Sequence, residues 1–325
     1  MALETYFKEM RQRFATLVAE KPQEVTTHRC SICIGTNSVS LLHINKTQET
    51  VELLLSETFQ FDEINNIPLI LSGLVQQYSL QNIPTYWLLP PDEYQLFLIE
   101  SLPVKAEEFQ DALRWRIKSL LTYPIEEATI DYFQLPAKKS TPDHTMIAAV
   151  TARTTQLLRI IDILKKSNID LTIIDIPELA MRNLTKLYEN DEKSTAFIYF
   201  YDKIAILNIS CQKTLFFTRR LTLANESELS DTHYEQLCLN LLRYFDYFQS
   251  QWRYPQPNRI LIASEKNNTT TIAQKLSQNL SLNVEPLALK AVLLDSAKIQ
   301  SLEKQHLLNV GCALREEQTY VASGN

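Results

Sequence analysis

The sequence predicts an α/β protein of two lobes, because one order of elements occurs twice along the chain. Each round reads as three strands, a helix, a strand and a helix, from the spacing of the apolar residues. The 325 residues suffice for two lobes, since domains of about 100 to 200 residues are typical. Within the first round, Trp87 to Leu135 reads as strand, strand, helix and strand. This segment is too short to bury a core alone, so we expect an inserted subdomain.

The first round begins at Arg29, where an apolar strand leads into a tight turn near Gly35. The strands expected in this round are 29–34, 39–45, 50–59, 85–89, 146–151 and 171–176, and the helices are 66–78, 155–167 and a proline-started helix ending near 188. The helix of the insert is predicted from apolar residues four apart, at Phe109, Leu113, Ile117 and Leu121. Acidic residues gather at the start of this segment and basic residues toward its end, so their charges compensate the helix dipole.

The second round repeats this pattern after a polar stretch at 190–194, where we expect the lobes to divide. Its expected strands are 195–201, 204–209, 215–223, 259–263 and 283–286, and its helices are 228–252, 270–280 and a last helical region. The predicted domains are an N-terminal helix and linker at 1–27, a first lobe at 28–190 with an insert at 90–145, and a second lobe with the C-terminal helical region at 191–325.

The first residues of the chain form an amphipathic pattern that predicts a helix over 3–17. Leu3, Phe7, Met10, Phe14 and Leu17 share one face at spacings of three and four. This face packs on the protein's own body or on a second copy in a homodimer, and contact with a membrane surface is the alternative. Residues 21–27 read as a linker.

Composition excludes several classes of function. The net charge of −6 and the lack of a basic stripe argue against nucleic-acid binding. No apolar run approaches the roughly 20 residues of a membrane-spanning helix, and no signal-peptide core is evident at the start. Five scattered cysteines fit a reducing compartment better than a disulfide framework. We therefore expect a cytoplasmic protein.

The residues that form catalytic or metal sites in other proteins have structural explanations here. Cys30 and Cys33 match C-x-x-C, but residues three apart in a strand point to opposite faces, so the two sulfur atoms do not share a metal. The paired glutamates at 107–108 and 126–127 fall at helix starts or turns, where acidic side chains interact favourably with the positive end of the helix dipole or with solvent. The five histidines have no metal-ligand spacing. The sequence thus predicts no metal site and no catalytic residues.

The insert resembles that of a known family. Its order of Leu89-Pro90, two short strands, an acidic-start helix, Tyr123-Pro124, Ile125-Glu-Glu-Ala and Ile130-Asp-Tyr resembles the inserted subdomain of the PilM family, the actin-like cytoplasmic proteins of type IV pilus assembly. Within that family the chain is most similar to the MshI proteins of mannose-sensitive haemagglutinin pilus biogenesis. The resemblance spans roughly residues 28 to 315. It implies an actin-like (ribonuclease-H-like) fold with a cleft between the lobes.

The resemblance also implies a nucleotide site, which needs an Asp-x-Gly turn in each lobe and a Gly-Gly loop. In the first lobe, Cys33 stands where the metal-holding aspartate belongs, before Gly35, Thr36, Asn37 and Ser38. In the second lobe Asp202 is followed by lysine, and Ser264-Glu265 replaces the paired glycines. The whole chain contains four glycines, although phosphate-binding loops commonly use several. We expect a degenerate site without cofactor. ATP with Mg²⁺ bound at Gly35 to Ser38 and Asp202 is the disfavoured alternative.

Members of the PilM family take the extended cytoplasmic tail of a PilN-type inner-membrane protein in a groove between the first lobe and its insert. The resemblance places six residues near that groove, each with core packing as the alternative: Tyr86, Leu88, Tyr94, Leu96, Trp115 and Tyr123. The predicted function is a non-catalytic scaffold of a type IV (MSHA-type) pilus, held at the inner membrane by this partner. Two alternatives remain, an active actin-like ATPase or sugar-kinase relative, and an adaptor of the GspL kind from type II secretion.

Overall fold

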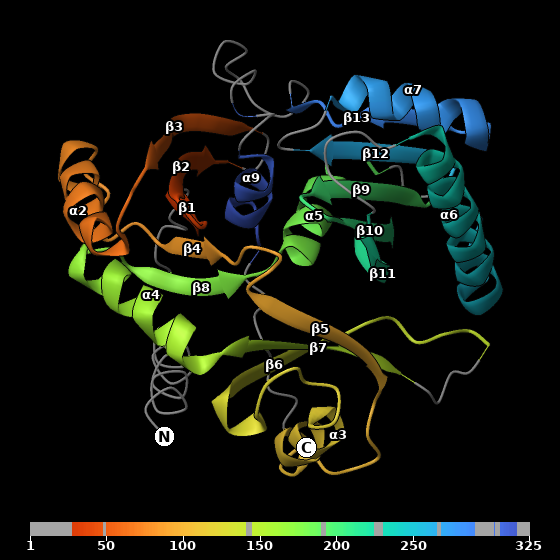
Figure 1. The fold of residues 1–325 in the computed structure, drawn as a ribbon, viewed down its shortest axis with the longest axis horizontal. Coiled ribbons are helices and arrows are strands. Elements are labelled where there is room, and N and C mark those ends of the chain that lie inside the picture. The colour runs from red at the N-terminus through yellow and green to blue at the C-terminus, as the bar shows by residue number, and fades with distance from the viewer. Residues whose placement is uncertain are drawn as a thin grey trace.

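The computed structural model describes residues 28–47, 50–140, 145–189, 193–223, 230–264, 268–289, 302 and 306–316. It contains two large sheets side by side and a smaller sheet that lies beneath both (Figure 1). The expected helix at 3–17 and the linker that follows it lie outside the described residues, as do 190–192 of the expected lobe boundary.

The first lobe is built on a five-stranded sheet with the order β3-β2-β1-β4-β8. Its strands are β1 (His28–Ile34), β2 (Ser38–Lys46), β3 (Val51–Gln60), β4 (Thr85–Leu88) and β8 (Leu171–Asp175). The first three strands pair antiparallel, and β1, β4 and β8 run parallel. Helices α2 (Ile67–Gln77) and α4 (Thr154–Lys166) cover one face, and their apolar stripes form a core with Ile32, Leu41 and Trp87.

The second lobe repeats this arrangement with the strand order β11-β10-β9-β12-β13. Its strands are β9 (Thr195–Tyr201), β10 (Ile204–Cys211), β11 (Thr214–Thr222), β12 (Arg259–Ser264) and β13 (Asn283–Pro286). Helices α6 (Asp231–Trp252) and α7 (Thr269–Leu280) cover the outer face (Figure 1). Both rounds predicted from the sequence are therefore present, each with its helix-covered sheet.

Two helices fill the space between the lobes. The inner faces of both sheets pack against α5 (Pro177–Thr185) and α9 (Leu307–Ala313) in one apolar cluster. Helix α9 crosses α5 so closely that a Cβ added at Gly311 would lie 2.3 Å from the carbonyl oxygen of Ala180. The carbonyl oxygen of Gly311 accepts a hydrogen bond from Asn183 Nδ2 at 2.9 Å. A larger residue at position 311 would force the two helices apart.

The insert forms a three-stranded antiparallel sheet in the order β5-β7-β6. Its elements are β5 (Tyr94–Glu100), α3 (Phe109–Ile117), the short 3-10 turn η2 (Ile125–Glu127), β6 (Ala128–Gln134) and β7 (Met146–Arg153). A second 3-10 turn, η1 (Ile64–Asn66), lies in the first lobe directly before α2. Helix α3 packs on one face of this sheet through Phe109, Leu113 and Ile117. Residues on the other face, including Val150 and Ala152, pack on the core of the first lobe.

The small sheet extends beyond the insert boundary expected at residue 145. Its central strand, β7, lies between β5 and β6 and begins at Met146. The sequence predicts a strand here but places it after the insert, because the pairing partners of a strand are not encoded locally. Without β7 the strands β5 and β6 have no neighbour in this sheet.

The two cysteines of the C-x-x-C match face opposite sides of the first sheet, as their spacing predicts. Cys30 is buried in the core beneath α2 and α4, whereas Cys33 packs against the cluster between the lobes. Burial raises the pKa of the Cys30 thiol to about 12. These thiols are packing groups in the structure. Among the helices that the structure describes, none is long and apolar enough to cross a membrane.

Candidate functional site: an interlobe cleft and a hollow beside the insert

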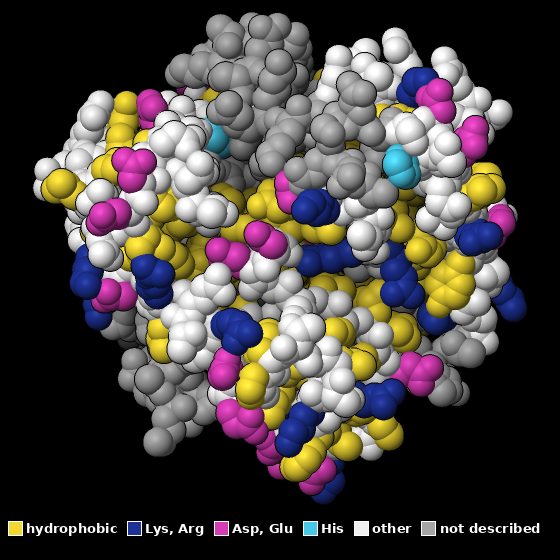
Figure 2. Space-filling model, in the orientation of Figure 1, with side chains coloured by type: hydrophobic (Ala, Val, Ile, Leu, Met, Phe, Trp, Pro, Cys, Tyr) yellow, Lys and Arg dark blue, Asp and Glu magenta, His cyan; other side chains and the backbone are white. Residues whose placement is uncertain are grey.

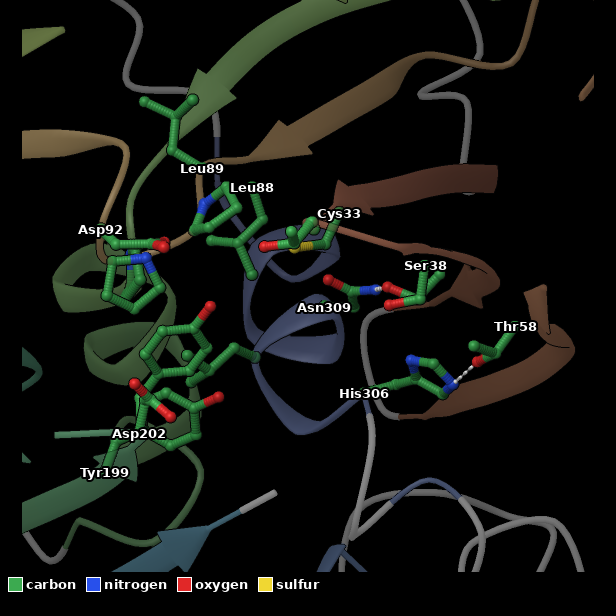
Figure 3. Close-up of a pocket in the computed structure, with 18 of the residues that line it drawn as sticks. Cys33, Ser38, Thr58, Leu88, Leu89, Asp92, Tyr199, Asp202, His306 and Asn309 are labelled. Carbon is green, nitrogen blue, oxygen red and sulfur yellow. Dashed lines mark hydrogen bonds between the residues drawn. The ribbon is translucent and has the colours of Figure 1, made fainter. Parts of the chain in front are cut away.

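A cleft of about 780 Å³ separates the two lobes. One wall comes from the β1–β2 turn and the adjacent strands, and carries Ser38, Ser40 and Thr58. The opposite wall comes from the end of β9 and carries Tyr199 and Asp202 (Figure 3). The remaining lining residues come from the loop after β4, the start of α5, the end of β12 and the α9 region. This position agrees with the cleft that the resemblance implies.

All five residues predicted for residual nucleotide binding line this cleft: Gly35, Thr36, Asn37, Ser38 and Asp202. The backbone at this turn already uses part of its hydrogen-bonding capacity. Gly35 N donates to Ser38 O at 2.9 Å, and Asn37 O accepts from Phe61 N at 2.9 Å. Gly35 does not have a positive φ, and a Cβ there would make only ordinary contacts. The turn is therefore a closed hairpin connection that does not require glycine.

Asp202 occupies the turn between β9 and β10 with a φ of 48°. Aspartate tolerates this left-handed conformation better than most residues, which gives it a structural reason to be there. Its carboxylate nevertheless borders the cleft together with that of Asp92.

The described residues that line the cleft carry negative charge and no positive charge. Among the described residues that line it there is no lysine or arginine, whereas two carboxylates, Asp92 and Asp202, are present. Burial lowers the pKa of His306 to about 4, so this side chain is neutral at pH 7. Like charges repel strongly in a partly desolvated site. No group of three or more histidine, cysteine, aspartate or glutamate side chains that could hold a metal occurs among the described residues.

The α9 region supplies polar lining residues that the sequence did not predict. Asn309 Nδ2 donates to Ser40 Oγ at 2.7 Å, and His306 Nε2 is hydrogen-bonded to Thr58 Oγ1 (Figure 3). These partners are 269 and 248 residues apart in the chain. No local pattern links such distant residues, so their meeting follows only from the return of the C-terminal helix to the first lobe.

A second, more apolar hollow of about 270 Å³ lies between the first lobe and the insert. Residues from β6, β7, β8, α4 and α5 line it. Strand β8 is the outer strand of the first sheet and β6 is the outer strand of the small sheet. Strands in that position have unpaired backbone groups along one edge. The charged groups at this hollow are Asp131, Asp175 and Arg315.

Three of the six residues predicted for a partner groove lie in the interior. Tyr86 is fully buried in the cluster between the lobes. Leu88 lines the interlobe cleft. Tyr94 is buried, and its hydroxyl donates to the carboxylate of Glu178.

The other three lie on or near the insert. Leu96 packs against the core of the first lobe, and Tyr123 lies under the guanidinium of Arg153, 4.4 Å from the ring centroid. Trp115 is 74% exposed on α3. None of the six lines the hollow beside the insert. The residues that do line it include Thr129, Asp131 and Phe133 on β6. These three residues alternate along the strand and therefore share one face, and this spacing was the sequence signal that could have identified them.

Two lobes with the same succession of elements, joined by α5 and α9 around a cleft, define an actin-like fold. A solved structure described as the PilM-PilN type IV pilus biogenesis complex contains a similar chain. The likeness has a TM-score of 0.68 at 16% identity and covers 88% of this chain and 98% of that one. At this identity it shows a shared fold.

Two further solved structures are similar at lower scores. One is the cytoplasmic domain of EpsL, an inner membrane component of the type II secretion system of Vibrio cholerae, with a TM-score of 0.48, 11% identity, and coverage of 90% of this chain and 97% of that chain. The other, from Bacteroides thetaiotaomicron, is described as having an actin-like ATPase fold and unknown function, with a TM-score of 0.49, 9% identity, and coverage of 80% and 91%. No protein-family model and no curated protein sequence matches the chain.

Proposed function

We propose that this chain is a non-catalytic cytoplasmic scaffold of type IV pilus biogenesis, and that it binds the cytoplasmic tail of a PilN-like inner-membrane protein. The observation that carries the proposal is the apolar hollow between two outer strands, β6 and β8. It occurs on a chain that shares its fold with a chain of the PilM-PilN complex. The partner's tail lies in this hollow in the proposed complex.

The hollow suits an extended peptide. Outer strands offer unpaired N–H and C=O groups that an added strand can pair with, while pockets receive alternate side chains. Apolar side chains of Leu157, Ile174 and Leu179 line the hollow and would receive such side chains. A peptide there would contact both the first lobe and the insert, and would therefore join them.

The proposal includes a cleft that does not hydrolyse nucleotides. Phosphoryl transfer depends on cations that neutralise the charge of the transferred phosphate. The described lining of this cleft offers two carboxylates and a neutral histidine instead. An active ATPase or sugar-kinase relative is the alternative, and it requires Mg²⁺ bound near Asp202.

The assignment of the chain to a particular pilus system rests on the sequence of the insert. Its run from Leu89-Pro90 to Ile130-Asp-Tyr is most similar to MshI proteins, so we assign the chain to an MSHA-type pilus within the proposed function. A GspL-like adaptor of type II secretion is the alternative system. The genes beside this one would distinguish the two, because they would belong to the pilus system in one case and to the secretion system in the other.

Titration with the partner's tail tests the proposal. The probe is a synthetic peptide with the cytoplasmic sequence of the PilN-like protein encoded beside this chain, and isothermal titration measures its Kd. We expect saturable binding to the native chain and none to Thr172→Trp, because Thr172 lines the hollow on β8 and a large ring would fill it. The matched control is Leu69→Trp, at a residue that is 82% exposed on α2. A well-folded native chain that fails to bind the tail contradicts the proposal.

A further inference from the structure

Trp115 is an exposed aromatic residue at the outer end of the molecule. Its side chain is 74% exposed, whereas Trp87 and Trp252, the other two tryptophans of the chain, are buried. It belongs to α3, which covers the face of the small sheet that is turned away from the first lobe. Figure 1 shows α3 at the end of the molecule farthest from the two large sheets. Trp115 lines neither the cleft nor the hollow, so its ring is available to a surface outside the chain.

Apolar residues on both sides of α3 are exposed as well. Val104 lies before the helix and Leu120 shortly after it, and their side chains are 39% and 45% exposed. A single exposed apolar residue is common on protein surfaces, but exposed apolar residues that gather in one region commonly mark an interaction site. Three of them in one helix and its flanking turns therefore indicate a surface that binds something.

The end of α3 that carries Trp115 is basic. The stretch 112–125 contains Arg114, Arg116 and Lys118 and no acidic residue. Arg116 and Lys118 are exposed, and Lys118 Nζ lies over the Trp115 ring, 5.3 Å from its centroid. The acidic residues of this segment lie around the first turn of the helix, at its opposite end. Figure 2 shows hydrophobic and basic side chains next to each other over the insert, at the lower end of the molecule.

This combination of groups fits the surface of an anionic membrane. Tryptophan prefers the layer where the headgroups meet the acyl chains, because its ring is buried there while its N–H stays with polar groups. Arginine and lysine attract anionic headgroups, and their aliphatic stems lie along the apolar layer. A helix at the far end of the fold also reaches a flat surface without a collision between that surface and either lobe.

The proposed function places a membrane beside this helix. Thr129, Asp131 and Phe133 of β6 line the hollow, and α3 packs on the other face of the same small sheet. The small sheet alone therefore separates α3 from a tail bound in the hollow. Because such a tail belongs to an inner-membrane protein, the bilayer is within reach of α3 in the proposed complex.

We propose that the basic end of α3 docks on the anionic surface of a membrane, with the Trp115 ring in the headgroup layer and with Arg116 and Lys118 against lipid phosphates. The inference rests on the proposed function, because the partner brings the insert to the bilayer. It adds the direction in which the protein faces that bilayer: the insert lies toward the membrane, and both lobes lie away from it.

Tryptophan fluorescence of the native chain tests the docking directly, because Trp87 and Trp252 are buried and Trp115 is exposed. The probes are vesicles of phosphatidylcholine mixed with phosphatidylglycerol. We expect the emission to shift to shorter wavelength as vesicles are added, and we expect lipids brominated on their acyl chains to quench it. High salt should reverse the shift, since it screens the attraction between charges. Vesicles of phosphatidylcholine alone should produce little shift.

Substitutions at exposed positions separate the two contributions to binding, which vesicle sedimentation measures. Trp115→Ser should weaken binding to the mixed vesicles roughly tenfold through the loss of apolar burial. Arg116→Glu with Lys118→Glu should weaken it by roughly tenfold or more. The matched control is Arg159→Glu with Lys165→Glu, at two exposed basic residues of α4 in the first lobe. Its binding should stay within about twofold at physiological salt, where distant charges are screened.

A relocated tryptophan reports whether another face of the protein binds instead. In the double variant Trp115→Phe with Leu69→Trp, the exposed tryptophan lies on α2 of the first lobe, at a position that is 82% exposed in the native chain. We expect its emission to stay unchanged with vesicles and to escape quenching by the brominated lipids. Equal responses from position 69 and from native Trp115 would overturn the proposed direction.

Two further results would overturn the inference. One is unchanged emission of the well-folded native chain with the mixed vesicles. The other is a shift of Trp115 emission with rising protein concentration and no vesicles, since a second copy would then cover this surface. Neither result affects titration with the partner's tail, so a chain that binds the tail but gives either result keeps the proposed function and loses the inference. A chain that binds no tail contradicts the proposed function, whatever the vesicles show.

Discussion

The carboxylate of Glu178 accepts a hydrogen bond from Arg220 Nε at 3.1 Å, which ties helix α5 to strand β11 of the second lobe. The Tyr94 hydroxyl, from the insert, donates to the same carboxylate, and the Arg220 guanidinium lies 4.2 Å from the centroid of the Tyr94 ring. Arg220 Nη1 also donates to Pro91 O at 2.7 Å. One ion pair and its hydrogen bonds therefore connect the first lobe, the insert and the second lobe. Basic side chains also gather on the surface where β11 meets the insert (Figure 2).

Removing one partner of this pair should destabilise the protein strongly. In Arg220→Met the carboxylate of Glu178 stays fully buried without its counter-charge, and loss of one partner in such pairs costs about 3 kcal/mol. Urea unfolding followed by tryptophan fluorescence measures the change. The double variant Arg220→Met with Glu178→Gln should recover part of the loss, because the uncompensated charge is gone. Equal stability of the native chain and Arg220→Met would show that the pair does not hold the lobes together.

Two glycines provide a matched pair of substitutions with opposite signs. In Gly311→Ala the new methyl group meets the Ala180 carbonyl between α9 and α5, and we expect a loss of about 3 kcal/mol from overpacking. In Gly73→Ala, on α2, nothing lies within 4 Å of the added methyl group, and alanine in a helix interior should stabilise by about 1 kcal/mol. Thermal unfolding of both variants tests the close crossing of α5 and α9. A neutral Gly311→Ala would contradict it.

Stability should fall between pH 6.5 and pH 4 partly through His306. Burial lowers its pKa from 6.5 to about 4, so the folded state favours the neutral ring. The stabilisation is present above the unfolded pKa and is lost as the pH falls through the folded pKa. His306→Gln removes this titration. Between pH 6.5 and pH 4 the free energy of unfolding of His306→Gln should therefore fall by about 3 kcal/mol less than that of the native chain. Parallel pH profiles for the two proteins would contradict the prediction.

Nucleotide should not stabilise the protein. The described lining of the interlobe cleft carries carboxylates and lacks lysine and arginine, so we expect Mg-ATP at millimolar concentration to leave the Tm unchanged. Differential scanning fluorimetry measures the shift, and phosphate release measures turnover. A rise in Tm with Mg-ATP that Asp202→Asn abolishes would favour the ATPase alternative and place the metal at that carboxylate.

The two-lobed fold was predictable because its strands and helices are encoded by patterns of neighbouring residues in the sequence. Apolar periodicity marks the strands and helices of both rounds, and the described elements lie close to the predicted ranges. The position of β7 was not predictable in the same way. Its sequence reads as a buried strand in either sheet, and only three-dimensional pairing with β5 and β6 places it in the insert.

The candidate sites were predictable to different degrees. The turn from Gly35 to Ser38 and Asp202 lies at the cleft, because the ends of equivalent strands in the two rounds meet there. His306 and Asn309 were missed, since their partners lie in distant strands. Large aromatic residues such as Tyr86 fit both a groove and a core, and the structure places Tyr86 in the core.

Hydrogen exchange with and without the partner's tail peptide tests the central claim most directly, because it reports both whether the tail binds and where. We predict slower exchange of backbone amides in β6 and β8, the outer strands beside the hollow, with no change at the β1–β2 turn of the cleft. Unchanged exchange in β6 and β8 at saturating peptide, or protection only at the cleft turn, would contradict the account.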